Sequence, residues 1–558
     1  MNRHFGYARS LLVVGLLGAF LSIGFAAPAG APRRGPDFGL MLNDDGGLSF
    51  MDSDPRRVEA GLRRMIRSLE GTGVKTLIYQ VVAGSETMLY PTTVGSAWGW
   101  RNAPGESAPP WNVRMPFLRA AVANRLDAGR IAAEEAKSMG MYFMPAYRMN
   151  DAHFSSKPFD HPVTGRFWIE NHERLRIGQS PFARLPFYAN LLDFTHQEVR
   201  DHRLAIIREI VGRYADIMDG LQLDFMRHPF FFPPGTGESR QSLMTELMLE
   251  VRQLLDAAGK RQGRFLALSV RIPPTLRGCQ EAGLDVRTWL QRRLVDVLVL
   301  SPSMILTHDM PLDEFVGLVR PAGARVYAAI FRHTTHTWPY TFEPTPDSYL
   351  HTAARIPSSS LPAQVRGAAL SYRGMNADGF ELYNFNLPAA PSALEVMAAL
   401  AEPQKGMRVY AITPAYASDR ENLVEYRKQI PVSLSPGAPA ELTIIVGEKQ
   451  SGRDLPAISR AALRLGVRNI DDLKANLVIE LNGRSIHDGP MEPIAHRIVE
   501  PKARPSRIEP PRAEYYLQIR VSDRRLVQEG RNRLTLRLRA PSQSAVEVVE
   551  VQMAFIGE

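Results

Sequence analysis

Residues 218–229 read MDGLQLDFMRHP, and this stretch decides the fold. Its first part, Gly220 to Asp224, is a short apolar run that ends in a carboxylate, which is typical of a buried strand. A run with helical period follows near 241–258. A strand followed by a helix is the repeating unit of a parallel sheet, so the stretch predicts an α/β fold.

The same strand-then-helix unit can be marked eight times between residues 37 and 404. The expected strands are 38–43, 74–82, 140–147, 220–224, 265–271, 295–301, 325–332 and 379–384. The expected helices lie near 54–70, 116–138, 197–215, 241–258, 285–293, 311–319, 362–373 and 391–402. Eight units predict a (β/α)8 TIM barrel, because a doubly wound sheet more often has five or six strands and a glycine-rich first turn, and no such turn follows the first strand.

From residue 405 the helical period disappears and short alternating runs take over, separated by turn residues such as Asn482-Gly483. The expected strands are 432–434, 440–446, 461–467, 476–481, 515–521, 532–538 and 546–554. Closely spaced short strands with turn chemistry between them predict an all-β sandwich over residues 405–558.

The first 31 residues have the pattern of a signal peptide and leader. Arg3 and Arg9 precede the apolar run from Leu11 to Phe25, and small residues follow it. The run is shorter than the roughly 20 residues that cross a bilayer, so we expect a cleaved leader and no stable membrane span afterwards. Export through a Sec-type signal predicts a bacterial periplasmic or extracellular protein.

Composition excludes several classes of protein. The chain has 67 basic and 58 acidic residues, a formal charge of +9 that falls to +7 without the leader, and the excess is not concentrated anywhere. A nucleic-acid binder would gather its basic residues on one face, so we expect no nucleic-acid partner. The single Cys279 rules out an internal disulfide and a cysteine zinc site. No cofactor is indicated, and the oligomeric state is left open.

Polar and aromatic residues gather just after the expected strands, where a TIM barrel has its active site. Aromatic rings can stack on the apolar face of a sugar, while carboxylates, amides, His and Arg bind its hydroxyls. This mixture predicts a carbohydrate substrate. The expected substrate-binding residues are Arg148, Asn150, Asp151, His153, Arg227, His228, Arg271, Trp98, Trp100, Trp111, Tyr383 and Asn384.

The stretch from Asp219 to Pro229 resembles the DGIHLDYxRYP segment of glycosyl-hydrolase-like family 10, which comprises secreted bacterial barrels of the glycosidase type. The similarity extends to the residues after strand one, to 148–153, 268–271 and 379–385, and covers roughly residues 37–400. It implies a (β/α)8 glycoside hydrolase with an appended domain. The chain departs from the pattern at Phe225 and His228, where the family usually has Tyr.

Glycoside hydrolysis needs two carboxyl groups on either side of the bond that is cleaved. Asp224 is the first candidate, as general acid with a pKa raised by apolar neighbours such as Phe225 and Phe230. Many barrel glycosidases have a Glu at the end of strand seven, whereas this chain has Ile330-Phe331-Arg332 there. Glu381 of strand eight is therefore the best second carboxyl, and its place across the ring favours an inverting separation. Either Asp44 or Asp45 could replace it. An ion pair between Asp224 and Arg271 that orders the rim is the structural alternative.

Two other functions compete with this hypothesis. The missing strand-seven Glu is compatible with a non-catalytic sugar-binding protein on a glycosidase scaffold, because a fold does not establish an activity. A metal-dependent carbohydrate deacetylase or hydrolase is the second, since Asp44-Asp45-Gly46 is similar to the paired Asp of polysaccharide deacetylases. Such enzymes need two His four residues apart, whereas His333 and His336 are three apart, so we expect no dedicated metal site.

Overall fold

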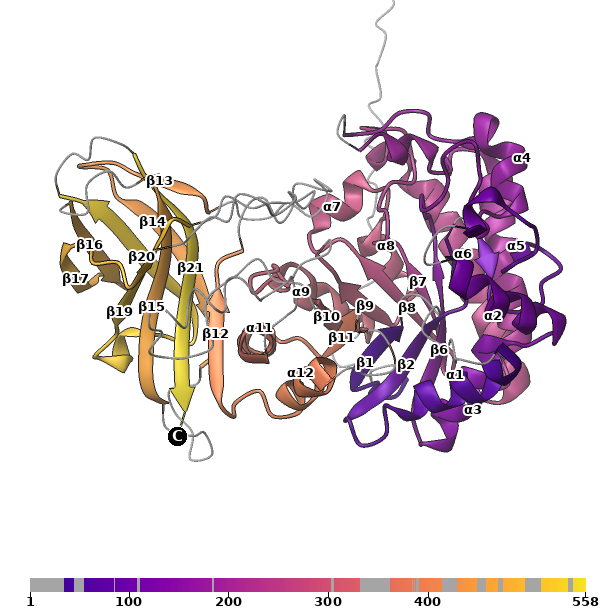
Figure 1. Ribbon diagram of the computed structural model, residues 1–558, viewed down its shortest axis with the longest axis horizontal. Helices are drawn as coiled ribbons and strands as arrows, with labels where there is room; N and C mark the ends of the chain where they lie inside the picture. The colour runs from indigo at the N-terminus through magenta and orange to yellow at the C-terminus, as the bar shows by residue number, and fades with distance from the viewer. Residues whose placement is uncertain are drawn as a thin grey trace, which may run out of the picture.

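A computed structural model of the chain shows a barrel of strands and helices beside a β-sandwich (Figure 1). The structure describes residues 35–44, 55–84, 86–107, 111–182, 185–302, 306–331, 362–383, 385, 387, 391–413, 429–448, 458–469, 475–496, 513–539 and 545–557. The predicted leader lies outside these residues. Within them, no helix is long and apolar enough to cross a membrane.

The eight expected barrel strands all form, and they close into a parallel barrel in the order β1-β11-β10-β9-β8-β7-β6-β2. The prediction of a TIM barrel is therefore confirmed. The strands are β1 (Leu40–Asp44), β2 (Val74–Gln80), β6 (Tyr142–Arg148), β7 (Gly220–Asp224), β8 (Ala267–Ile272), β9 (Val297–Leu300), β10 (Arg325–Phe331) and β11 (Gly379–Tyr383).

Helices cover the outside of the barrel. They are α1 (Val58–Arg67), α2 (Trp111–Ala123), α3 (Ala128–Ser138), α4 (Arg166–Leu175), α5 (Gln197–Tyr214), α6 (Gln241–Gln262), α7 (Leu276–Glu281), α8 (Val286–Gln291), α9 (Asp313–Ala322), α11 (Pro362–Gly374) and α12 (Pro391–Ala401). The single helix expected over 116–138 was wrong. Arg125 has a left-handed φ of 52°, and the Asp127 carboxylate caps the N–H of Arg130, so α2 ends and α3 begins there.

Two cores stabilise the barrel. Apolar side chains such as Leu77, Leu221 and Leu298 lie between strands and helices. Others, including Met41, Met144 and Val297, fill the inside of the barrel. Because successive side chains of a strand point to opposite sides, the polar residues Asn43, Gln222 and Glu381 also point inward, toward the middle of the barrel. The inside is therefore apolar at one level and polar at another.

The sandwich has two antiparallel sheets around its own apolar core, as predicted. One contains β12 (Met407–Ala411), β21 (Val546–Gly557), β15 (Ile458–Arg468), β19 (Tyr515–Arg520), β18 (Ala495–His496) and β13 (Val432–Leu434). The other contains β14 (Ala440–Val446), β20 (Gly530–Leu538), β16 (Asn476–Leu481) and β17 (Arg484–Pro490). A separate small sheet, β3 (Val82–Ala83), β4 (Thr87–Met88) and β5 (Ser96–Ala97), lies in the loop after β2. In the sandwich, the sequence analysis missed β12, β17 and the two-residue β18.

Helix α11, which leads into β11, packs directly against the sandwich. A Cβ added at Gly367 would lie 2.0 Å from the carbonyl oxygen of Val409 in β12. A Cβ added at Gly447 would lie 2.3 Å from the carbonyl carbon of Leu370, and the Ser371 hydroxyl donates to the Ile445 carbonyl at 3.2 Å. The approach of backbone to backbone at Gly367 is possible only without a side chain.

We therefore expect Gly367→Ala to destabilise the protein, because the added methyl group would push α11 away from β12. Overpacking of this kind costs about 1–3 kcal/mol of unfolding free energy, measurable by urea denaturation. Gly212→Ala in α5 is the matched control, since a Cβ there meets nothing within 4 Å and Ala favours a helix. Equal stability of the two variants would show that the contact between α11 and β12 is loose.

Candidate active site

Asp224 lies at the carboxyl end of β7 and forms a buried ion pair with Arg271 of the neighbouring strand β8. The guanidinium lies 2.7 Å from Asp224 Oδ2, and the two residues are register partners in the parallel sheet. The Met226 N–H donates to Oδ1 at 2.8 Å, and the Tyr383 hydroxyl lies 3.4 Å from Oδ2. Both carboxyl oxygens therefore receive donors, an arrangement that suits the charged carboxylate.

This geometry corrects the expected surroundings of Asp224. Phe225 faces the helices and belongs to the outer core, and Phe230 packs in a separate aromatic cluster. A guanidinium, and not an apolar pocket, adjoins the carboxylate, so the role of general acid fits it poorly. The ion pair that the sequence analysis gave as the alternative is present. Arg271 is itself held by a contact with Ser301 Oγ at 2.8 Å and by the Tyr383 ring, 3.8 Å from its guanidinium carbon.

Glu381 points into the barrel two residues before Tyr383 on β11, so it lies one layer deeper. It accepts hydrogen bonds from Asn43 Nδ2 at 3.1 Å and from Gln222 Nε2 at 2.6 Å. Asn43 also donates to Gln222 Oε1 at 2.7 Å. Burial raises the pKa of Glu381 to about 7, although Arg271, Gln222 and Asn43 act in the opposite direction. A carboxyl group with this pKa holds a proton over much of the neutral range.

The other candidate carboxylates do not join this pair. Asn43 points into the barrel, so Asp44, the next residue, points to the other side, toward its register partner Tyr79. Burial raises the pKa of Tyr79, and the negative charge of Asp44 adds to the effect. Tyr79 belongs to the core between strands and helices, so Asp44 as a substitute for Glu381 was wrong. Asp45, Asn384, His333 and His336 lie outside the described residues. At strand seven, Phe331 fills the inward position.

Four expected binding residues form a second cluster beside the mouth. Arg148 of β6 donates to Asp151 Oδ2 at 2.9 Å, and His153 donates from Nδ1 to Asp151 Oδ1. Arg227 lies with its guanidinium 2.7 Å from His153 Nε2. Burial lowers the pKa of His153, so at neutral pH its ring is neutral and can accept from Arg227. The cluster touches the ion pair, because Arg148 and Asp224 are register partners.

Asp151, His153 and His228 are the group within the described ranges whose potential metal ligands all lie within 4.8 Å of one another. The hydrogen bonds do not suit a cation. The Ala152 N–H donates to His228 Nδ1 at 3.0 Å, and Arg227 occupies the lone pair of His153 Nε2. A metal ion would displace these donors and would sit beside two guanidinium groups, which repel it. The residues therefore do not fit a metal.

Of the three tryptophans expected to bind sugar, the structure contradicts Trp98 and shows Trp100 held by the protein, while Trp111 stays a prediction. Trp98 is buried, donates to the Thr87 carbonyl at 3.1 Å and lines an apolar cavity with Leu118 and Ile131. Trp100 donates to the Thr164 carbonyl at 3.2 Å, and the Arg166 guanidinium lies over its ring. Both rings thus stabilise the long loop after β2. Trp111 is the first residue of α2, and the structure does not describe its side chain.

Several other residues also differ from the sequence prediction. Asn150 acts as a brace, because its side chain bonds the Leu192 and Phe230 carbonyls at 2.9 Å each. The sequence analysis missed Gln222, although a polar residue two positions before Asp224 in a buried strand must point to the same side. It also missed the aromatic residues around His228, for which the sequence has no periodic signal.

Comparisons with known proteins show similarity to solved barrels. A Paenibacillus cycloisomaltooligosaccharide glucanotransferase has 10% identity and a TM-score of 0.34 over 95% of this chain and 58% of that one. An α-L-fucosidase from Paenibacillus thiaminolyticus has 12% identity and a TM-score of 0.38 over 65% of this chain and 48% of that one. The β-amylase catalytic domain of Paenibacillus polymyxa has 11% identity and a TM-score of 0.35 over 67% of this chain and 100% of that one. The chain thus spans about half the length of the first two.

These identities and scores are too low to carry an argument about activity. No family model matches the chain, and no curated protein matches it either. Its membership of glycosyl-hydrolase-like family 10 therefore stays a prediction.

Arg271→Gln should strongly destabilise the protein, because it leaves the Asp224 carboxylate buried beside a neutral group. Breaking a buried pair from one side costs about 3–5 kcal/mol of unfolding free energy, measurable by urea denaturation. The control is Arg208→Gln, which removes an exposed contact to Glu250 and should leave the midpoint nearly unchanged. Similar losses in both variants would contradict the central place of the ion pair.

Glu381 should make stability depend on pH near neutrality. Its pKa rises from the ordinary 4.5 to about 7 on folding, so the folded state holds the proton more tightly. The stabilisation is complete below about 4.5 and is lost as the pH rises through 7. Relative to Glu381→Gln, the wild type should lose about 3 kcal/mol of unfolding free energy between pH 4.5 and 7.5. Urea denaturation across this range checks the difference, and parallel curves would contradict it.

Proposed function

We propose that this chain is an exported glycoside hydrolase in which Asp224 and Glu381 act as the two carboxyl groups. The observation that carries the proposal is their opposite settings within one barrel mouth. Asp224 accepts from a guanidinium and an amide, whereas burial raises the pKa of Glu381 to about 7. Two carboxyl groups with opposed environments are the pattern of an anionic partner and a proton donor in glycosidases.

The two groups divide the reaction between them. The Asp224 carboxylate faces the positive charge that develops on the sugar in an oxocarbenium-like transition state. Protonated Glu381 supplies the proton that the leaving oxygen needs as the glycosidic bond breaks. Water then adds to the anomeric carbon and gives up a proton, which restores protonated Glu381. The assignment reverses the role first expected for Asp224, because the ion pair with Arg271 belongs with the charged form. Arg271 and Tyr383 position the carboxylate from two sides.

A second candidate function is supported by a different observation. Asp224 and Glu381 have no exposed surface, and each of their four carboxyl oxygens already accepts a hydrogen bond from the protein. A sugar reaches Glu381 only if Asn43 and Gln222 turn aside. This closed arrangement favours a non-catalytic carbohydrate-binding protein, in which the half-exposed His153 and Arg227 would contact the ligand.

The wild type should release reducing ends from at least one soluble polysaccharide, with a rate that falls as the pH rises above about 7, because Glu381 must be protonated. Asp224→Asn should lower the rate at least about a hundredfold and retain binding. Glu381→Gln should lose far less of its hydrolysis rate on a dinitrophenyl glycoside, whose leaving group needs no proton, than on a polysaccharide. Reducing-end assays, aryl glycoside kinetics and affinity electrophoresis give these values.

The control is Asp216→Asn, which alters an exposed carboxylate paired with Arg130 far from the mouth. Binding by the wild type and by Asp224→Asn without hydrolysis by either would overturn the enzyme and support the binding protein. An equal loss of rate in Glu381→Gln on both substrates would show that Glu381 is not the proton donor.

A further inference from the structure

A continuous strip of rings runs from the mouth cluster across the loops after β6 and β7. We call it the aromatic strip, and it comprises His161, Phe154, His153, His228, Phe187 and Phe182. Its ring centroids lie 3.5 Å apart for Phe154 and His161, 5.9 Å for His153 and Phe154, 4.9 Å for His153 and His228, and 5.9 Å for Phe187 and His228. Tyr188 contacts both Phe187 and Phe182, which joins the far end.

Phe154 is the most unusual member of the strip. Its side chain is 41% exposed, whereas most large apolar side chains of the barrel are buried. Its backbone has a left-handed φ of 61°, a conformation that a Phe rarely adopts and that is strained without a glycine. His161 packs on the ring, and the part of the ring that stays exposed is accessible to a ligand. Backbone outliers of this kind cluster at ligand-binding sites.

The loop around Phe154 is held firmly in place. The Thr164 hydroxyl donates to the Phe154 carbonyl at 2.8 Å, and the Ser155 hydroxyl donates to the Ala152 carbonyl at 2.7 Å. The ring lies flat on His161, with an angle of 6° between the planes. Both Thr164 and Ser155 are fully buried. The exposed ring is therefore preorganised, which lowers the entropy cost of binding to it.

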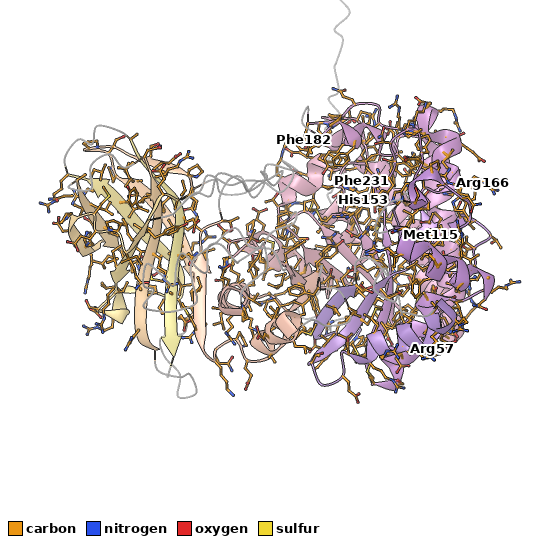
Figure 2. The ribbon with its side chains drawn as sticks, viewed as in Figure 1. Arg57, Met115, His153, Arg166, Phe182 and Phe231 are labelled. Carbon is orange, nitrogen blue, oxygen red and sulfur yellow. The ribbon has the colours of Figure 1, made fainter. Side chains whose placement is uncertain are left out.

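The strip is continuous with the proposed active site. His153 belongs to both, through Asp151 and Arg227, and Figure 2 shows His153 and Phe182 at the same end of the barrel, opposite Arg57. Burial lowers the pKa of His161 and His228 to about 4, so both rings are neutral at neutral pH. His228 is buried, whereas Phe154 is exposed and His161, Phe187 and Phe182 are half-buried. The strip therefore offers ring surface on both sides of His228, which suits the apolar face of a pyranose.

We propose that the aromatic strip is an extended subsite that binds successive sugar rings of a glycan chain, so that the substrate is an oligosaccharide or polysaccharide and not a short glycoside. The inference rests on the proposed function, whose site it extends. Phe154 and His161 would bind a unit remote from the cleaved bond, and Phe187 and Phe182 would bind the chain on the other side of His228.

The test measures binding by calorimetry in the Glu381→Gln background, which slows hydrolysis and leaves the buried pair of Asp224 and Arg271 intact. The probes are maltohexaose, cellohexaose and chitohexaose, with the disaccharide of each series. Phe154→Ala should weaken the hexasaccharide that binds by about tenfold and leave its disaccharide unchanged, because one stacked ring is lost. Phe154→Tyr should restore the affinity. Phe154→Gly removes the ring and relieves the backbone strain, so it should weaken binding equally without loss of stability.

Val113→Ala is the control, since it truncates a side chain of α2 that is 59% exposed and lies away from the strip. A hexasaccharide that binds wild type and Phe154→Ala equally would overturn the subsite and leave the proposed function intact. Equal weakening of hexasaccharide and disaccharide would also overturn it, because the ring would then belong to the mouth itself. Binding of no probe by the parent protein would overturn the proposed function, and the subsite with it.

Discussion

The Asp224 carboxylate is a charge without access to water, and the rest of the site depends on how that charge is neutralised. Arg271 can reach it at 2.7 Å only because β7 and β8 hold the two residues in register. Tyr383 arrives from β11 across the mouth and covers the guanidinium with its ring. A buried ion pair adds little net stability, but either half alone is very costly. The pair therefore ties the registers of three strands to one another.

Burial has a different effect on the carboxyl group of Glu381, which lies one layer deeper in the barrel. Glu381 has amide donors in place of a cation. Two amides do not offset the full free-energy cost of burying a charge, so Glu381 keeps its proton to higher pH. Below this level the barrel is filled by apolar side chains such as Met144 and Val297. The polar belt thus lies between an apolar floor and a charged mouth. Its two carboxyl groups have different partners, a guanidinium at Asp224 and two amides at Glu381.

A feature of this fold could be predicted from the sequence where neighbouring residues determine it, and could not where residues distant in the chain do. Strand β7 and the inward direction of Asp224 could be predicted, because strand length and alternation are local. The burial of Trp98 could not, since it depends on which residues pack around the ring. The break at Asp127 and the outward direction of Asp44 have local signals, a capping carboxylate and strand alternation, which the prediction did not use. Arg271 was found as a rim residue, but its effect on the role of Asp224 required the distance between them. The exposed position of Phe154 could not be predicted, because nothing in the sequence marks a Phe that has a left-handed φ.

The sandwich is linked to the candidate site through the backbone of α11. Gly367 and Ser371 bind α11 closely to β12 and β14, and α11 leads into the strand that carries Glu381 and Tyr383. On the other side of the interface, Arg531 pairs with Asp313 of α9 at 2.9 Å. A displacement of α11 would move β11 relative to β7, and the contacts of Tyr383 with Asp224 and of Glu381 with Gln222 would lengthen together. The position of the second carboxyl group in the barrel is therefore a property of both domains.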